Sequence, residues 1–442
     1  MILITLGNNM EGNVKRKTVL GIDEVSRLLR DSGIGATNGK INFPNAILRN
    51  YARLNKPLPF GVAYAVGMFA IYPMYESLSK DADLASIFGD PNLAKTQSVA
   101  LLSSIYNRGT MSAAGSEDML AGIIAAIFDY DINNSSQGIL RFTSPKIICD
   151  NCGTGGDNIN TFHISTTAAV LIATYGVTND LAIVKHGSPG NAQKSGSSDF
   201  FEYVGIDTRT GPERVIQYLN GSNLSYTESI DTRYKCIHVS GQREHRISTM
   251  NAIIGPMTNP IEPTELTVKL LGCNQIVPPA VVAEAYKLLN QIGITNVARG
   301  LFVRGLIRKN NTLQTIDEVS ILNAGTEMAL LYRGEVTKIR ITFESFGFRG
   351  PARLEELIPS RNNAKDRIEY TLRVLDLDAP DGAVNTLIAN TAALIALERF
   401  DGSSELPDFK GAAIEVRSLL RDKKHEQVIS KIKEINSRLN VK

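Results

Sequence analysis

The sequence lacks tryptophan altogether, and aromatic residues make up only 7% of its 442 residues. Cysteine is scarce too, with four in the chain, which argues against the dense disulfide framework of small secreted domains. Cys149 and Cys152 form a C-x-x-C pair, but Cys236 and Cys273 stand alone, so the second pair that a structural zinc site needs is missing. A redox motif is equally disfavoured, and we expect buried thiols.

An excess of charge of either sign is also missing. The chain carries 47 basic and 45 acidic residues, which gives a net charge of +2. This balance argues against nucleic acid and anionic membranes as partners. The longest apolar stretch, residues 61–72, is too short to span a bilayer, and residues 1–6 lack the basic start and the length of a secretory signal. We therefore expect a cytoplasmic protein.

The length of the chain predicts two domains, since one core rarely grows to this size. Residues 1–41 form an N-terminal extension of unknown role with a helix at 23–31. Residues 42–135 show helical spacing and no convincing strand, which predicts an all-helical domain. Residues 136–442 alternate β-rich runs with helical patterns, which predicts an α/β domain with a mainly parallel central sheet. The expected strands are 147–148, 181–184, 235–239, 266–271, 298–303, 328–331 and 336–341, and the expected helices include 383–397 and a pair within 411–439.

The stretch 149–199 carries the strongest functional signal. An apolar run ends in the turn Gly153-Thr154-Gly155-Gly156-Asp157, where missing side chains let backbone N–H groups approach a ligand. Residues 165–167, Ser-Thr-Thr, then predict an N-cap, so a helix N-terminus faces the turn and favours an anion. Lys185 follows a buried strand, at the sheet edge where α/β proteins bind ligands. A second loop, residues 188–198, is rich in glycine and hydroxyl groups.

A glycine turn of this kind is often only a tight connection. The spacing matches neither the Walker loop nor the dinucleotide-binding pattern. Two such loops on adjacent strands, together with a lysine and an acidic residue, favour phosphate binding over a structural turn. We therefore expect a polyphosphate ligand.

These residues closely resemble the signature of anthranilate phosphoribosyltransferases, whose GTGGD turn, N-I-S-T helix start and K-H-G loop hold phosphoribosyl pyrophosphate (PRPP). Two further segments extend the similarity: residues 251–260, NAIIGPMTNP, and residues 316–320, IDEVS. The latter resembles the family's metal-binding acidic pair. The resemblance implies a helical domain that forms a homodimer contact and an α/β domain that binds PRPP.

The resemblance also implies roles for individual residues. Mg²⁺ would be held by Ser165, Asp317 and Glu318, whose hard oxygen atoms suit this ion. No nucleophile is implied, because positioning and neutralisation of the pyrophosphate suffice. The residues implied to bind PRPP are Gly153, Thr154, Gly155, Gly156, Asp157, Thr161, His163, Ser165, Thr166, Lys185, Ser195 and Ser197.

The departures from the family pattern concentrate on the acceptor side. His163 replaces the asparagine of N-I-S-T, and Ser188-Pro189 replaces the Asn-Arg that follows K-H-G. The family's His-Pro helix and its arginine for the anthranilate carboxylate have no clear counterpart. Either Arg243 or Arg246 is a candidate for that role, with Arg243 favoured. The expected acceptor-binding residues are Gly153, Ser188 and Arg243.

The sequence therefore predicts a Mg²⁺-dependent transfer of the phosphoribosyl group from PRPP to the amine of anthranilate, as in tryptophan biosynthesis. An alternative within enzymes is the same donor chemistry, or a phosphorylase-like reaction, on another aromatic or heterocyclic acceptor. An alternative from another class is a non-catalytic member of the fold that binds nucleic acid or a protein. The near-neutral charge and the acidic pair Asp317-Glu318 argue against it.

Overall fold

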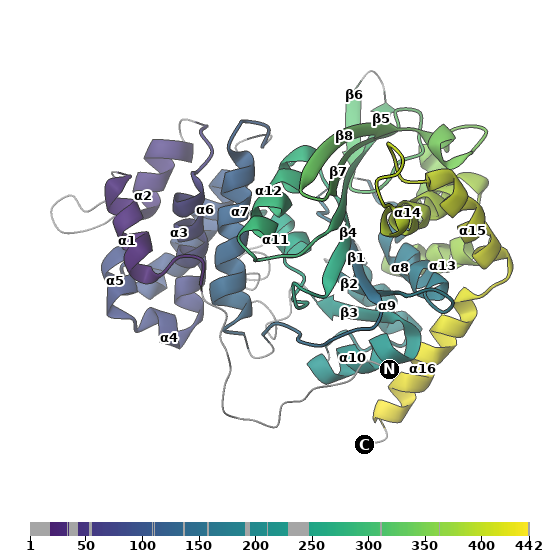
Figure 1. The fold of residues 1–442 in the computed structure, drawn as a ribbon, viewed down its shortest axis with the longest axis horizontal. Helices are drawn as coiled ribbons and strands as arrows, with labels where there is room; N and C mark the ends of the chain where they lie inside the picture. The colour runs from purple at the N-terminus through teal and green to yellow at the C-terminus, as the bar shows by residue number, and fades with distance from the viewer. Residues whose placement is uncertain are drawn as a thin grey trace.

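The computed structural model describes residues 18–32, 34, 43–52, 55–107, 109, 111–135, 138–156, 159–190, 195–209, 211–228, 247–309, 312–361 and 363–440. In the first part of the chain, the described residues form helices and their connections without strands, and they lie at one end of the molecule (Figure 1). Its helices are α1 (Ile22–Asp31), α2 (Phe43–Ile47), α3 (Phe60–Ile71), α4 (Glu76–Ser79), α5 (Ala82–Phe88), α6 (Pro91–Asn107) and α7 (Ser116–Ala126), with the shorter helical turns η1 (Leu48–Ala52), η2 (Tyr72–Met74) and η3 (Ile127–Ile132).

Helix α3 is the centre of this helical part. Its residues are apolar on all sides, and every residue from Val62 to Ile71 is buried. A helix that is hydrophobic all round belongs in a core. Close packing against α7 depends on small residues, since a Cβ on Gly122 would lie 2.4 Å from the carbonyl oxygen of Phe60. Helix α1 confirms the helix expected at 23–31, and its Val25 and Leu29 join the same core.

The described residues of the second part form one eight-stranded sheet. Its strands are β1 (Ile147–Gly153), β2 (Leu181–Gly187), β3 (Leu224–Glu228), β4 (Leu266–Gly272), β5 (Arg299–Lys309), β6 (Thr312–Ile316), β7 (Thr326–Tyr332) and β8 (Glu335–Ile341). The order is β3-β2-β1-β4-β5-β7-β8, with β6 paired to β5. Strands β3, β2, β1, β4 and β5 are parallel, whereas β6, β7 and β8 join antiparallel. The expected α/β fold with a mainly parallel sheet is confirmed.

Helices cover both faces of the sheet (Figure 1). They are α8 (Ile164–Tyr175), α9 (Ser197–Val204), α10 (Pro212–Ser222), α11 (Asn251–Met257), α12 (Pro279–Gln291), α13 (Ala364–Leu375), α14 (Asp381–Arg399), α15 (Phe409–Arg421) and α16 (His425–Asn440), with the turns η5 (Phe343–Phe346) and η6 (Leu354–Leu357). Strand β5 shows how the cores divide: Phe302 joins the core shared with α11, α12 and the helical part, while Leu301 and Val303 join the core under α8, α14 and α15. Burial on both faces explains the nearly continuous apolar runs of the central strands.

Two of the described strands, β3 and β6, were not predicted from the sequence. Strand β3 buries Ser225, Thr227 and Glu228, so it lacks an apolar run, and β6 exposes most of its residues. The strand expected at 235–239 lies outside the described residues. The helices expected at 383–397 and within 411–439 are confirmed as α14, α15 and α16.

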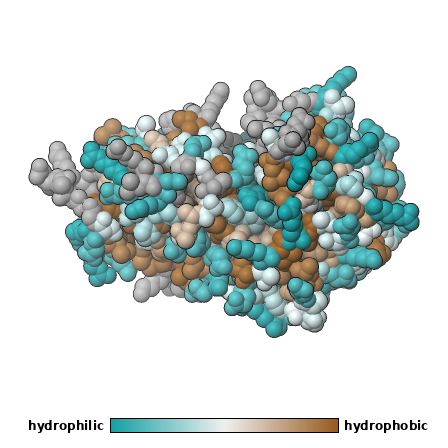
Figure 2. All heavy atoms as spheres, turned by 90° about the horizontal axis from the view of Figure 1, so that it is seen from above, coloured by the Kyte–Doolittle hydropathy of each residue, from teal (hydrophilic) through white to brown (hydrophobic). Residues whose placement is uncertain are grey.

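The surface shows the mixture expected of an ordinary globular chain. In the view from above, hydrophobic and hydrophilic side chains are interspersed across the face (Figure 2). Within the described residues, no helix combines the length and the apolar character needed to cross a membrane. The buried cysteines expected from the sequence are confirmed for Cys149, Cys152 and Cys273; Cys236 lies outside the described residues.

Candidate functional site

A cavity of about 300 Å³ opens at the carboxyl ends of β1 and β2. Of the described residues that the sequence predicted for the site, only Thr154 is absent from its lining; the hydroxyl of Thr154 instead accepts the backbone N–H of Asn274 at 2.9 Å. Asp157, Arg243 and Arg246 lie outside the described residues. The predicted residues that line the cavity are Gly153, Gly155, Gly156, Thr161, His163, Ser165, Thr166, Lys185, Ser188, Ser195, Ser197, Asp317 and Glu318.

The glycine turn meets the acidic pair from another part of the chain. Gly155 and Gly156 have φ angles of +62° and +80°, which residues other than glycine rarely adopt. The backbone N–H of Gly155 donates to Asp317 Oδ2 at 2.6 Å. A Cβ on Gly153 would lie 2.1 Å from the same oxygen atom. The missing side chain at Gly153 therefore makes room for the Asp317 carboxylate.

Helix α8 begins earlier than the sequence predicted. Residues 165–167 were expected to form its N-cap, but the helix starts at Ile164, follows His163 and has no side-chain cap. Ser165 therefore lies in the first turn, and its backbone N–H donates to Glu318 Oε1 at 3.2 Å. The expected cap is wrong because a carboxylate distant in sequence satisfies this N–H group, and a negative charge is favourable at a helix N-terminus.

Lys185 stands beneath the start of α8 at the end of β2. It is only 1% exposed, and its Nζ donates to the carbonyl oxygen of Asn151 at 2.8 Å and to Ser165 Oγ at 3.4 Å. Burial lowers the pKa of Lys185 below its usual value, since desolvation disfavours the ammonium form. An anionic ligand in the cavity would oppose that shift and stabilise the cation.

His163 takes the position where the resembled family has asparagine. Its ring is 5% exposed, and Nε2 lies 2.9 Å from the hydroxyl of Ser195. Burial lowers the pKa of His163 well below its usual value, and the positive charges of Arg367 and Lys185 lower it further. The imidazole is thus neutral at physiological pH, and it serves as a hydrogen-bonding group rather than a cation.

Arg367, which sequence reasoning missed, is part of the wall of the cavity. It lies on α13, and it donates from Nε to the carbonyl oxygen of Thr161 at 2.7 Å and from one terminal nitrogen to that of Ser195 at 2.6 Å. It therefore joins the segment before α8 to the segment before α9. Asn160 and His186 also line the cavity without having been predicted. His186 lies beside the predicted Lys185 in the K-H-G segment, but the sequence offered no motif that singles out Arg367.

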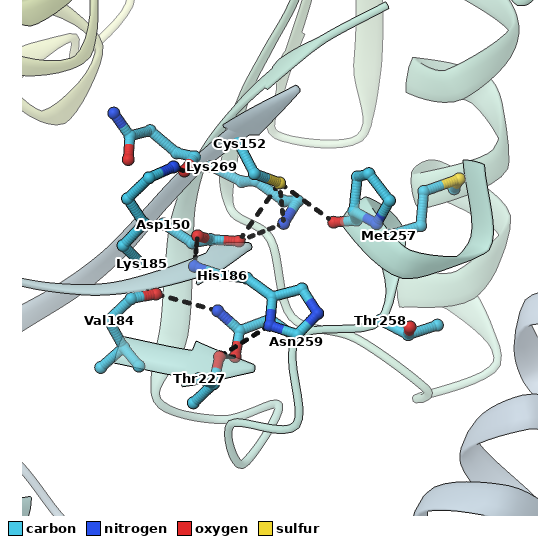
Figure 3. A network of polar contacts seen from close by, with 12 residues as sticks. Asp150, Cys152, Val184, Lys185, His186, Thr227, Met257, Thr258, Asn259 and Lys269 are labelled. Carbon is cyan, nitrogen blue, oxygen red and sulfur yellow. Dashed lines mark hydrogen bonds and ion pairs between the residues drawn. The ribbon is translucent and has the colours of Figure 1, made fainter. Parts of the chain in front are cut away.

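A buried polar network supports the floor of the site (Figure 3). Asp150 accepts the backbone N–H of His186 at 2.9 Å and the ammonium of Lys269 at 2.5 Å, and the side chains of this ion pair are fully buried. Asn259, from the segment that resembles a family motif, donates to the carbonyl oxygen of Val184 at 2.9 Å. The ends of β1, β2 and β4 are thereby fixed relative to one another. The attraction of Asp150 outweighs burial and raises the pKa of Lys269 above its usual value.

The site combines features that suit a polyphosphate and a divalent cation. The glycine turn, a helix N-terminus and Lys185 attract anions. The half-buried carboxylates of Asp317 and Glu318 face the same cavity and supply the hard oxygen ligands that Mg²⁺ prefers. Together they define a site for a phosphorylated substrate and its metal ion, on an α/β scaffold that carries a helical part.

Comparison with known proteins gives the family. A model described as "Glycosyl transferase family, a/b domain" matches residues 145–422, so the chain belongs to this family. Curated relatives are anthranilate phosphoribosyltransferases: the protein of Petrotoga mobilis is 33% identical over 201 residues, which are 45% of this chain and 52% of the relative. That of Geobacillus thermodenitrificans is 28% identical over 303 residues, or 68% of this chain and 78% of the relative. The resemblance deduced from the motifs is confirmed.

Solved structures agree on the fold. The anthranilate phosphoribosyltransferase of Thermus thermophilus has a TM-score of 0.61 at 19% identity, and the match covers 87% of this chain and 98% of that one. The enzyme of Saccharomyces cerevisiae, in complex with PRPP and Mg, has a TM-score of 0.63 at 17% identity. The match covers 89% of this chain and 98% of the yeast chain. At these identities the likeness shows the shared architecture alone.

Proposed function

We propose that this chain transfers the phosphoribosyl group of PRPP to the amine of an aromatic acceptor, with anthranilate favoured, and releases pyrophosphate. This reaction belongs to tryptophan biosynthesis. The observation that carries the proposal is the convergence of the glycine turn, the start of α8, Lys185 and the acidic pair on one cavity. The names of the relatives, and the yeast structure that holds PRPP and Mg, support it.

Positioning and electrostatics account for the reaction. Backbone groups of the glycine turn and the start of α8 hold the phosphates, and Lys185 neutralises the departing pyrophosphate. Asp317 and Glu318, with the Ser165 hydroxyl beside them, would hold Mg²⁺, which supplies further neutralisation of the leaving group when bound. The neutral imidazole of His163 and the hydroxyl of Ser195 supply hydrogen bonds on the wall. No nucleophilic side chain is required.

The acceptor is the open part of the proposal. Ser188 lines the cavity where the family has asparagine, and Pro189 lacks the N–H group and the cation of the family's arginine. These departures favour, as a second candidate, the same donor chemistry or a phosphorylase-like reaction on another aromatic or heterocyclic acceptor. Arg243 stays our proposed partner for the acceptor carboxylate.

A pyrophosphate-release assay with PRPP, Mg²⁺ and a panel of aromatic and heterocyclic acceptors tests the function. We expect release with anthranilate, and loss of release in an Asp317→Ala/Glu318→Ala variant that keeps its fold. Release with a different acceptor alone would select the second candidate. Calorimetry with PRPP and Mg²⁺ separates binding from turnover: binding without turnover on any acceptor would leave a non-catalytic member of the fold, and failure to bind PRPP would refute the donor assignment.

A further inference from the structure

A second group of ligand-type side chains lies away from the cavity, where α13 ends and α16 begins. It consists of Asp376, the residue after α13, with His425 and Glu426, the first two residues of α16. One ligand atom from each of the three side chains lies within 4.8 Å of the others. His425 is only 1% exposed, whereas the two carboxylates reach solvent.

The buried imidazole of His425 forms a loose ion pair with the Asp376 carboxylate and no short hydrogen bond in the described part of the chain. Among the described residues, neither ring nitrogen has a hydrogen-bond partner, and Nε2 points toward Asp376 Oδ1 at 3.6 Å, which is beyond hydrogen-bonding distance. An unsatisfied buried polar group costs free energy, so such groups require an explanation. The ion pair with Asp376 accounts for Nε2 only in part, and it leaves Nδ1 of this ring without a hydrogen bond among the described residues.

The spacing fits ligands of one metal ion. Ligand atoms about 2.0–2.2 Å from a tetrahedral zinc ion lie roughly 3.3–3.6 Å from each other. The separation of His425 Nε2 and Asp376 Oδ1 falls at the upper end of that range. The carboxylate of Glu426 belongs to an exposed side chain and lies within 4.8 Å of both of these atoms. One imidazole and two carboxylates suit zinc better than Mg²⁺, which prefers oxygen atoms alone.

The ion pair between Lys423 and Glu426 must break for the metal ion to bind Glu426. Lys423 Nζ lies 3.6 Å from Glu426 Oε1, and both side chains are more than half exposed. An exposed pair of this kind contributes little to stability and holds its partners weakly. A divalent ion with three ligands therefore displaces Lys423 without difficulty.

We propose that Asp376, His425 and Glu426 form a zinc site that fastens α16 to the end of α13. Water completes the coordination on the exposed side. Helix α13 carries Arg367 of the cavity wall at its other end, and α16 packs against α8 and α9, which also border the cavity. The zinc ion thus braces the helices behind the candidate functional site, whatever reaction that site performs.

The test is zinc retention by the full chain. The protein is stripped with a chelator, given Zn²⁺ alone, passed over a desalting column and analysed by mass spectrometry for bound metal. An Asp317→Asn/Glu318→Gln background removes binding at the cavity. We expect one zinc per chain, and a zinc-dependent rise in melting temperature. Both should be lost in Asp376→Asn and Glu426→Gln, whose exposed positions leave the fold intact, and in His425→Gln.

Glu434→Gln is the matched control, because Glu434 is an exposed carboxylate of the same helix that forms surface ion pairs with Lys431 and Arg438. It should retain zinc like the parent chain. Cobalt(II) gives a second readout, since a tetrahedral site with this ligand set absorbs visible light and the variants should not. Absence of retained zinc in the parent chain would overturn the proposal, as would equal retention in Asp376→Asn, Glu426→Gln and Glu434→Gln.

Discussion

Replacing Gly272 by alanine should displace the acidic pair Asp317-Glu318 while both of these proposed metal ligands keep their side chains. Gly272 ends β4 and is the register partner of Gly153 at the end of β1. A Cβ on Gly272 would lie 1.6 Å from the backbone oxygen of Asp317 and 2.4 Å from its carbonyl carbon. A Cβ on Gly153 would meet the carboxylate of the same residue. Asp317 can thus lie close to the ends of β1 and β4 because the last residue of each strand is a glycine.

The magnitude follows from these distances. Ordinary van der Waals contact begins at 3.4 Å, so Asp317 must withdraw by roughly 2 Å from Gly272→Ala. A misplacement of about 1 Å in a positioned group can cost about 10²-fold in rate. We therefore expect kcat/KM to fall by about 10²-fold or more, with a higher Mg²⁺ requirement. Overpacking should lower the free energy of unfolding by about 1–3 kcal/mol.

The assay is pyrophosphate release at varied Mg²⁺, with calorimetric Mg²⁺ binding as a readout that does not depend on the acceptor. Gly334→Ala is the control for lost stability: Gly334 has a φ of +78° in the turn after β7, and no atom of the described residues lies within 4 Å of its added Cβ. It should destabilise by about 1 kcal/mol through backbone strain and leave activity unchanged. A folded Gly272→Ala variant with normal activity and Mg²⁺ dependence would refute the reasoning.

Two further predictions concern stability and assembly. Lys269→Met should lower the free energy of unfolding in urea by about 3–5 kcal/mol, because it leaves the Asp150 carboxylate buried without its cation. The double variant Asp150→Asn/Lys269→Met should recover most of that loss, and equal stability of the single variant and the parent would contradict the role of the pair. We also expect a homodimer through the helical region, residues 44–131, where Leu93 on α6 is 60% exposed. Sedimentation should show Leu93→Glu to be more monomeric than the parent chain, and a parent chain that is monomeric at all working concentrations would rule the dimer out.

The central strands were the most direct to predict, because burial on both faces leaves an apolar run. Residues 181–184 and 266–271 are such runs, and they became β2 and β4. Strand β3 escaped because its buried Thr227 is satisfied by side chains from elsewhere: its hydroxyl lies 2.7 Å from His186 Nδ1. Hydrogen bonds between distant segments replace the hydrophobic pattern there, and no local reading of the sequence can find them.

The placement of the donor-site residues was predictable because their position follows from topology. The turn at Gly153 and the segment at Lys185 follow adjacent parallel strands, and the carboxyl ends of parallel strands meet at one edge of the sheet. Asp317 follows β6, which pairs antiparallel with β5, so the meeting of parallel strand ends does not place it. Its place was inferred from the family resemblance, and the structure sets it against Gly155.

The wall of the cavity shows why the departures from the family pattern were harder to interpret. His163 replaces an asparagine, and taken alone the change looks like the exchange of one hydrogen-bonding group for another. In the folded chain the imidazole contacts the Ser195 hydroxyl, and the carbonyl oxygen of Ser195 is held by Arg367. Burial lowers the pKa of His163, and the positive charge of Arg367 lowers it further. The substitution is therefore part of a three-residue arrangement that spans about 200 positions, and its meaning resides in contacts that only the fold creates.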